Sequence, residues 1–152
     1  MNEKKIAVIN HYEKTIEWVN CLRKLPEDSW RTPLGEGKWT IAEVIGHLSP
    51  WDEFVLVQRI PYLINTLALP RSPEVEFVNQ KAAELSRNRP KGDTINQFIE
   101  IRKSLIVEIS NIPDELWGHD LSIGGKSISL IDYFAGLMEH DHHHFSQINV
   151  IV

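Results

Sequence analysis

Apolar residues recur with helical spacing, at every third or fourth position, over four long stretches of the chain. These stretches cover about residues 4–24, 41–67, 93–112 and 129–152. Such spacing is typical of helices that bury one face and expose the other. The second stretch contains Pro50 and Pro61. Because proline removes a backbone donor, we expect these residues to interrupt it and to bend the helix near Pro50.

Shorter segments connect these stretches. Residues 74–87 predict a further helix, which we expect over one end of the molecule, and residues 114–117 predict a single turn. Gly124-Gly125 predicts a tight turn, flanked by weak strand signals at 121–123 and 126–128. The sequence therefore predicts an all-α fold, a four-helix bundle with short extra helical segments in its connections. No Pro, Gly or Ser-rich linker divides residues 1–152, which predicts a single domain.

The first helix carries the chain's single cysteine near its end. We expect its core face to contain Ile6, Ile9, Tyr12, Ile16 and Val19. One cysteine excludes an intramolecular disulfide and a cysteine-rich structural zinc site. Because Cys21 follows Val19 and precedes Leu22, we expect a buried, unreactive thiol.

Charge and hydropathy exclude two classes of partner. The formal net charge is −5, and no basic run or stripe could neutralise phosphates, which argues against nucleic acid. No apolar run approaches 18 residues, which argues against a membrane span. We expect a cytoplasmic protein.

Two histidines lie on the apolar stripe of the fourth helix. The stripe consists of Tyr133, Leu137, His140, His144 and Ile148. Burying an unpaired polar ring costs about 1–3 kcal/mol, so two rings on one buried face need a shared partner. Side chains four residues apart on a helix are neighbours, and their ring nitrogens can converge on one divalent ion.

A third histidine has a similar setting on the second helix. Val44, His47, Trp51 and Phe54 share one helical face, and Thr40 with Glu43 forms a capping box that begins the helix. Three neutral imidazoles are typical of an open, catalytic metal site. The candidate ligands are therefore His47, His140 and His144.

Plainer interpretations exist for these residues. A lone His47 is more often a core histidine bonded to a carbonyl, and the HxxxH spacing is common on solvated helix faces. We expect His142 and His143 to be solvated or to hydrogen-bond the ligands from outside, and favour both over metal ligation; we expect His11 and His119 to be ordinary polar residues. Residues next to the ligands, namely Asp52, Glu139 and Asp141, should point away from the ligand face, because neighbouring helical residues diverge by about 100°.

Two motifs resemble those of a known family. Trp39-Thr40-x-x-x-Val44-x-x-His47 resembles the second-helix motif of the DinB-like and YfiT-like metal-binding bundles. His140-x-x-His143-His144-x-x-Gln147-Ile148 resembles their fourth-helix motif, with Ser146 where the family often has glycine. The resemblance implies one divalent ion, commonly zinc or nickel, on the same three histidines. It also implies a small-molecule substrate and a homodimer.

The resemblance leaves the reaction open. Some relatives resemble S-transferases that use a low-molecular-weight thiol, and others carry a hydrolase label. An ion with three imidazole ligands would hold a thiol as thiolate, or lower the pKa of bound water from 15.7 toward about 7. Because the sequence names no clear general base, we favour thiol transfer over hydrolysis, with a non-catalytic, metal-stabilised bundle as the third possibility. Trp51, Phe54 and Tyr133 are candidate pocket walls, and Gln147 is a candidate hydrogen-bond partner of a ligand ring.

Overall fold

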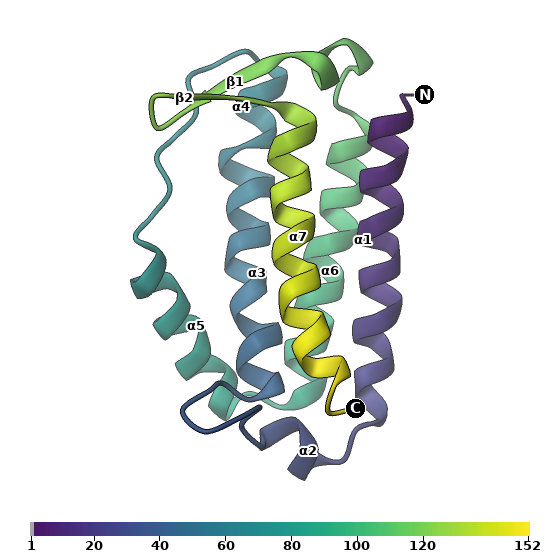
Figure 1. The fold of residues 1–152 in the computed structure, drawn as a ribbon, viewed down its shortest axis with the longest axis vertical. Coiled ribbons are helices and arrows are strands. Elements are labelled where there is room, and N and C mark those ends of the chain that lie inside the picture. Colours follow the sequence, from purple (N-terminus) through teal and green to yellow (C-terminus); the bar gives the residue numbers. More distant parts are fainter. Residues whose placement is uncertain (1) are drawn as a thin grey trace.

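Four long helices form the bundle in the computed structural model, which describes residues 2–152 (Figure 1). They are α1 (Glu3–Cys21), α3 (Ile41–Gln58), α6 (Lys91–Ser110) and α7 (Leu130–Asn149). The all-α, four-helix prediction is confirmed. Within the described residues, no helix is both long enough and apolar enough to cross a membrane.

The connections contain shorter elements. They are η1 (Leu22–Lys24), α2 (Glu27–Arg31), α4 (Ile60–Ile64), α5 (Val75–Asn88), η2 (Asp114–Gly118), β1 (Asp120–Ile123) and β2 (Lys126–Ser129). The two strands pair antiparallel as a hairpin. Gly124 and Gly125 make its turn with φ of 58° and 80°, a region that glycine enters without steric cost. The weak strand signals and the tight turn are thus confirmed.

Short polar side chains begin three of the long helices. The Asn2 side chain accepts a hydrogen bond from the backbone N–H of Lys4, and the Ser129 hydroxyl accepts one from Asp132. At α3, Thr40 accepts from the Glu43 N–H at 3.1 Å while the Glu43 carboxylate accepts from the Thr40 N–H at 3.1 Å. This reciprocal pair is the predicted capping box.

The long helices do not simply alternate in direction. Figure 1 shows α1 and α7 running one way along the bundle, and α3 and α6 running the other way. A long crossover containing α4 and α5 joins the parallel pair α3 and α6, which pack closely together. α5 lies along the flank of α3, so the expectation that it covers the bundle's end is wrong.

Three details of the helices differ from expectation. α3 runs unbroken through Pro50, and the chain breaks only at Arg59 before α4. The buried stripe of α1 passes through Val8, Tyr12, Thr15 and Val19, so it is turned relative to the predicted one and leaves Ile6 exposed. Cys21 is exposed rather than buried, because this stripe continues from Val19 to Leu22 and carries the position between them outward.

A buried ionic cluster separates two apolar halves of the core. One half gathers around Trp30, Ile45 and Phe98, and the other around Tyr12, Trp117 and Phe134. Between them lie the members of the ionic cluster, one or two from each long helix: His11, Thr15, Asp52, Arg102 and Asp141.

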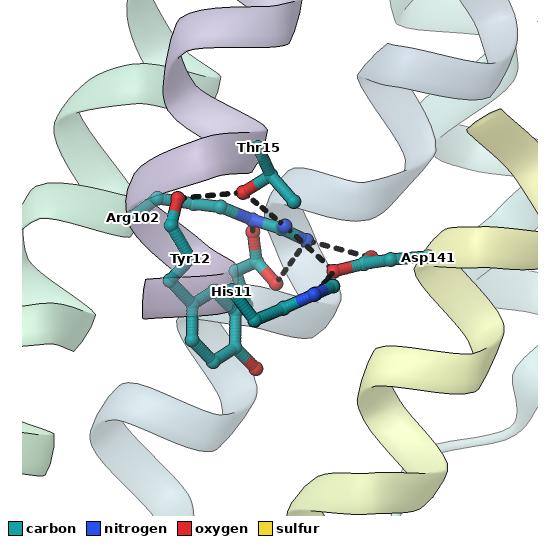
Figure 2. Close-up of polar contacts among 6 residues, drawn as sticks. His11, Tyr12, Thr15, Arg102 and Asp141 are labelled. Carbon is teal, nitrogen blue, oxygen red and sulfur yellow. Dashed lines mark hydrogen bonds and ion pairs between the residues drawn. The ribbon is translucent and has the colours of Figure 1, made fainter. Parts of the chain in front are cut away.

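Arg102 is the centre of the ionic cluster (Figure 2). Its guanidinium donates two hydrogen bonds to Asp141, at 2.7 and 2.9 Å, and two to Asp52, at 2.8 and 3.3 Å. A fifth reaches the Thr15 hydroxyl at 2.9 Å, so all five N–H groups of the side chain have acceptors. His11 Nε2 lies 2.7 Å from Asp141. Such complete pairing is what allows these charges to be buried.

Gly46 is a point of close approach between α3 and α5. An ideal Cβ at this position would lie 1.7 Å from the Ser86 hydroxyl oxygen and 2.8 Å from the Ser86 Cβ. The second distance involves an atom that cannot rotate away, so an added methyl would push the helices apart. An ideal Cβ at Gly136 on α7 would meet no neighbouring atom within 4 Å.

We predict that Gly46→Ala lowers the free energy of unfolding by about 1–2 kcal/mol, because overpacking outweighs the gain in helix propensity. Chemical denaturation followed by circular dichroism measures this change. Gly136→Ala is the control and should raise stability by about 0.5–1 kcal/mol. Adding Ser86→Gly to Gly46→Ala should remove most of the clash, and equal effects of the two alanine substitutions would contradict the packing argument.

Asp141 gives the ionic cluster a pH dependence. Burial raises the pKa of its carboxyl, but the Arg102 charge and the hydrogen bonds from His11 and Arg102 outweigh burial and lower it to about 2, against 3.8 unperturbed. A carboxyl with a depressed pKa in the folded state stabilises the fold above its unfolded pKa and loses this contribution as the pH falls through the folded value. The stabilisation should therefore disappear between about pH 4 and pH 2.

We predict that the difference in free energy of unfolding between wild type and Asp141→Asn shrinks by about 2 kcal/mol as the pH falls from 4 to 2. Urea unfolding in the presence of a chelator measures the difference free of metal effects. Glu139→Gln is the control, because Glu139 is exposed on the same helix. A difference that stays constant with pH would show that the ion pairs of Asp141 do not stabilise the fold.

Candidate metal centre

His47 is oriented by its own helix. It lies two turns after the capping box of α3 and is buried, with an exposed fraction of 2%. Its Nδ1 is within hydrogen-bond distance of the Val44 carbonyl, which can only accept, so Nδ1 carries the proton. Trp39 packs on the ring, with centroids 4.8 Å apart. Nε2 is thereby left unprotonated and directed away from its own backbone, as in metal-binding histidines.

His140 and His144 approach His47 from α7. Their Nε2 atoms are 3.1 Å apart, and one ring nitrogen from each of the three residues lies within 4.8 Å of the others. The structure thus brings together all three histidines that the sequence suggested. It does not bury them equally: His47 is buried, His144 is half-buried and His140 is exposed. The prediction that both α7 histidines face the core is wrong, because they lie at the edge of the bundle between α7 and α3.

The environment keeps these rings neutral. Burial, followed by the neighbouring His144, lowers the pKa of His47 from 6.5 to about 4. Burial and the adjacent His140 likewise lower the pKa of His144 to about 4, and burial lowers that of His140. At neutral pH all three offer lone pairs without first losing a proton.

This donor set fits a divalent ion. Two nitrogen ligands of one zinc ion lie at most about 4 Å apart, so a small rotation of the rings would close the site. Three protein ligands leave at least one coordination position open. The buried Nδ1 of His144 has no hydrogen-bond partner within residues 2–152, and a metal on its other nitrogen is compatible with this arrangement.

A cavity of about 320 Å³ lies between α3 and α7 and reaches the three-histidine cluster at His140. α3 packs closely on α5 and α6 but stands farther from α7, which leaves this space. His140 lines the cavity, together with the three residues suggested as pocket walls: Trp51, Phe54 and Tyr133. The Trp51 indole donates a hydrogen bond to Asn79 at 2.7 Å, which ties α5 to the cavity wall.

Charged residues also line the cavity. Asp52, Arg102 and Asp141, all from the ionic cluster, line it alongside His140. Asp52 and Asp141 thus share a cavity wall with His140, and the prediction that they point away from the ligand face is wrong. Glu139 is exposed, as expected. The bidentate bonds to Arg102 draw both carboxylates inward. Burial raises the pKa of Asp52 to about 6, even though the charge and hydrogen bonds of Arg102 oppose this.

Other histidines and Gln147 lie around the centre. His142, His143 and His119 are exposed, as predicted. Gln147 is half-buried, and the hydrogen bonds found within the described chain do not include one from its side chain to a ligand ring. Its role stays a prediction.

The sequence analysis missed the ionic cluster, although a signal was present. His11 is buried at 8% exposure against Asp141, so treating it as an ordinary polar residue was wrong. Arg102 follows Phe98 by four residues and precedes Leu105 by three, which places a charge on an apolar stripe. Asp52 stands in the same relation to Leu48 and Val55. Opposite charges on two buried stripes predict an internal ion pair.

Comparisons with known proteins identify the family and the fold of this chain. Residues 11–148 match the DinB superfamily. Among solved structures, the chain is similar to YfiT from Bacillus subtilis, described as a probable metal-dependent hydrolase with an unusual four-helix bundle topology. The TM-score is 0.77 at 16% identity, over 98% of this chain and 86% of YfiT, which establishes a shared fold. No curated protein matches the chain. Because the matched region spans nearly the whole sequence, this chain belongs to the DinB superfamily.

Proposed function

We propose that the protein is a metal-dependent enzyme that holds one divalent ion on His47, His140 and His144. The observation that carries the proposal is the convergence of three neutral imidazoles from two helices at the edge of a cavity. The description of YfiT as a probable metal-dependent hydrolase supports the same general class. Zinc and nickel are the proposed ions, since imidazole suits both.

The proposed reaction is transfer of a low-molecular-weight thiol to an electrophile. A divalent ion at this centre would supply a nucleophile at neutral pH, by lowering the pKa of a coordinated thiol or water. The cavity beside it is lined largely by apolar and aromatic side chains, including Leu48, Trp51 and Phe54, which suits an apolar electrophile. In the transfer, a carbon–sulfur bond forms, the leaving group departs with its electron pair, and the thiol proton passes to solvent.

The state of one cavity carboxylate, Asp141, favours transfer over hydrolysis. Hydrolysis benefits from a general base beside the attacking water. Asp141 is a weak base, because its pKa is held at about 2, and both of its oxygens already accept hydrogen bonds from Arg102. Transfer of a thiol that is already ionised needs no such base.

Hydrolysis is the second candidate, and one observation favours it. Asp52 lines the cavity with a pKa raised to about 6, close to the range in which a carboxylate accepts protons efficiently near neutral pH. Its oxygens accept hydrogen bonds from Arg102 and would have to be shared with water. The non-catalytic alternative, in which an ion only stabilises the bundle, leaves the cavity without a role. The homodimer and the cytoplasmic location stay predictions.

We predict that the wild type binds about one divalent ion per chain and that His47→Ala, His140→Ala and His144→Ala each lose it. Elemental analysis of untagged protein measures the stoichiometry. His143→Ala is the matched control, since His143 is exposed and next to a ligand, and it should retain the ion. At a free metal concentration of 100 times Kd, the wild type should also gain about 2.7 kcal/mol of stability. Metal that persists in all three alanine variants would refute the site.

We predict that the metal-loaded wild type accelerates the reaction of cysteine or bacillithiol with 1-chloro-2,4-dinitrobenzene, in which sulfur displaces chloride. Absorbance of the conjugate reports the rate, and the His47→Ala variant should show only the uncatalysed rate. Hydrolysis of 4-nitrophenyl acetate tests the second candidate in parallel, and there Asp52→Asn should lower turnover. A protein that binds metal but accelerates neither reaction would favour the non-catalytic alternative.

A further inference from the structure

Arg59 is a buried cation without a partner of opposite charge. It lies between α3 and α4 with an exposed fraction of 4%, and its Nε is buried without a hydrogen-bond partner. In the described part of the chain, no carboxylate oxygen comes within 4 Å of its guanidinium nitrogens. Arg102, equally buried, has all five N–H groups paired. An unpaired buried charge costs several kcal/mol. Arg59, unlike Arg102, therefore still lacks an anion that would compensate its charge.

The neighbours of Arg59 contact its guanidinium but do not neutralise its charge. The guanidinium carbon lies 4.9 Å from the ring centroid of Phe54, a cation–π contact that contributes about 0.5–2 kcal/mol. Burial raises the pKa of Tyr133, although the charge of Arg59 and a hydrogen bond from its side chain oppose this, so the phenol is neutral at physiological pH. Both neighbours leave the positive charge of Arg59 in place.

Arg59 faces the space that a ligand would occupy. It lines the 320 Å³ cavity that also contains Trp51 and His140. It lines, too, an adjoining groove that contains Ser72 and Arg71. Arg59, which lacks a carboxylate partner among the described residues, therefore belongs to the wall of the same cavity that His140 lines.

We propose that Arg59 binds the carboxylate of the small molecule that occupies this cavity. A guanidinium forms two parallel hydrogen bonds with a carboxylate, and one unpaired cation matches one negative charge. The apolar body of the molecule would lie against Trp51, Phe54 and Leu137. The proposal rests on the proposed function only in taking this molecule to be the substrate, which is then an apolar or aromatic monocarboxylate.

Phenylacetate and its neutral amide, phenylacetamide, test the proposal by NMR titration of the full chain. The first series contains a chelator, because a metal ion could itself bind the carboxylate. Wild type should bind phenylacetate more tightly than phenylacetamide, and the Arg59 Nε–H resonance should shift with phenylacetate alone. Arg59→Met should weaken phenylacetate binding about tenfold to hundredfold and abolish the preference over the amide.

Two further variants complete the series. Arg59→Lys keeps the charge but not the planar pair of donors, and should bind phenylacetate with intermediate affinity. Arg23→Met is the matched control, because Arg23 lies in η1, at the end of α1 away from α4, and is exposed. It should bind both probes as the wild type does. Circular dichroism establishes that each variant is folded, and the wild-type Nε–H shift keeps the test decisive if Arg59→Met does not fold.

Several results would overturn the proposal. One is a wild type that binds phenylacetate no more tightly than phenylacetamide. A wild type that binds neither probe would overturn it equally. Another is a folded Arg59→Met variant that retains the wild-type preference. A third is a preference that appears only after zinc is added and persists in Arg59→Met, which would place the carboxylate at the metal. Because binding is measured without turnover, absence of catalysis would refute the proposed function while leaving this result standing.

Discussion

The geometry of the whole molecule depends on the pairing of Arg102 with two carboxylates. Its five N–H groups reach Asp52 on α3, Thr15 on α1 and Asp141 on α7, so one side chain from α6 connects to every other long helix. Hydrogen bonds have strict distances and angles, whereas apolar contacts tolerate sliding. The ionic cluster therefore fixes how far each helix is displaced along its neighbours. Because Asp141 follows His140 directly, it also fixes the height at which the α7 histidines meet His47.

The fold and the clustering of the three histidines could be predicted from sequence because both depend on local periodicity. Helical spacing marked the four long helices, and the Thr40 and Glu43 capping box located the start of α3. The same spacing selected His140 and His144 but misjudged their burial. The core stripe of α7 runs through Phe134, Asp141, Phe145 and Ile148, and the histidines lie on its flank. Because Asp141 is polar, the apolar pattern of the sequence did not reveal that it lies on the core stripe of α7.

The cavity could not be predicted, because it depends on the distance between helices that are far apart in sequence. Packing of α3 on α5 and α6 draws it away from α7, and no local pattern encodes that separation. Arg59 illustrates the same limit. In sequence it is one arginine near a helix end, an unremarkable place for a cation, and only the folded chain encloses it.

The parallel arrangement of α3 and α6 has a consequence for how such a protein can diversify. Two adjacent parallel helices require a long connection, and here that connection, with α4 and α5, also supplies Ser72, Val75 and Asn79 to the cavity. The histidines lie on α3 and α7, outside this connection. Substitutions at Ser72, Val75 and Asn79 can therefore reshape what the cavity admits while the three histidines stay as they are. Part of the cavity wall can thus vary independently of the three histidines, because the two lie on separate parts of one chain.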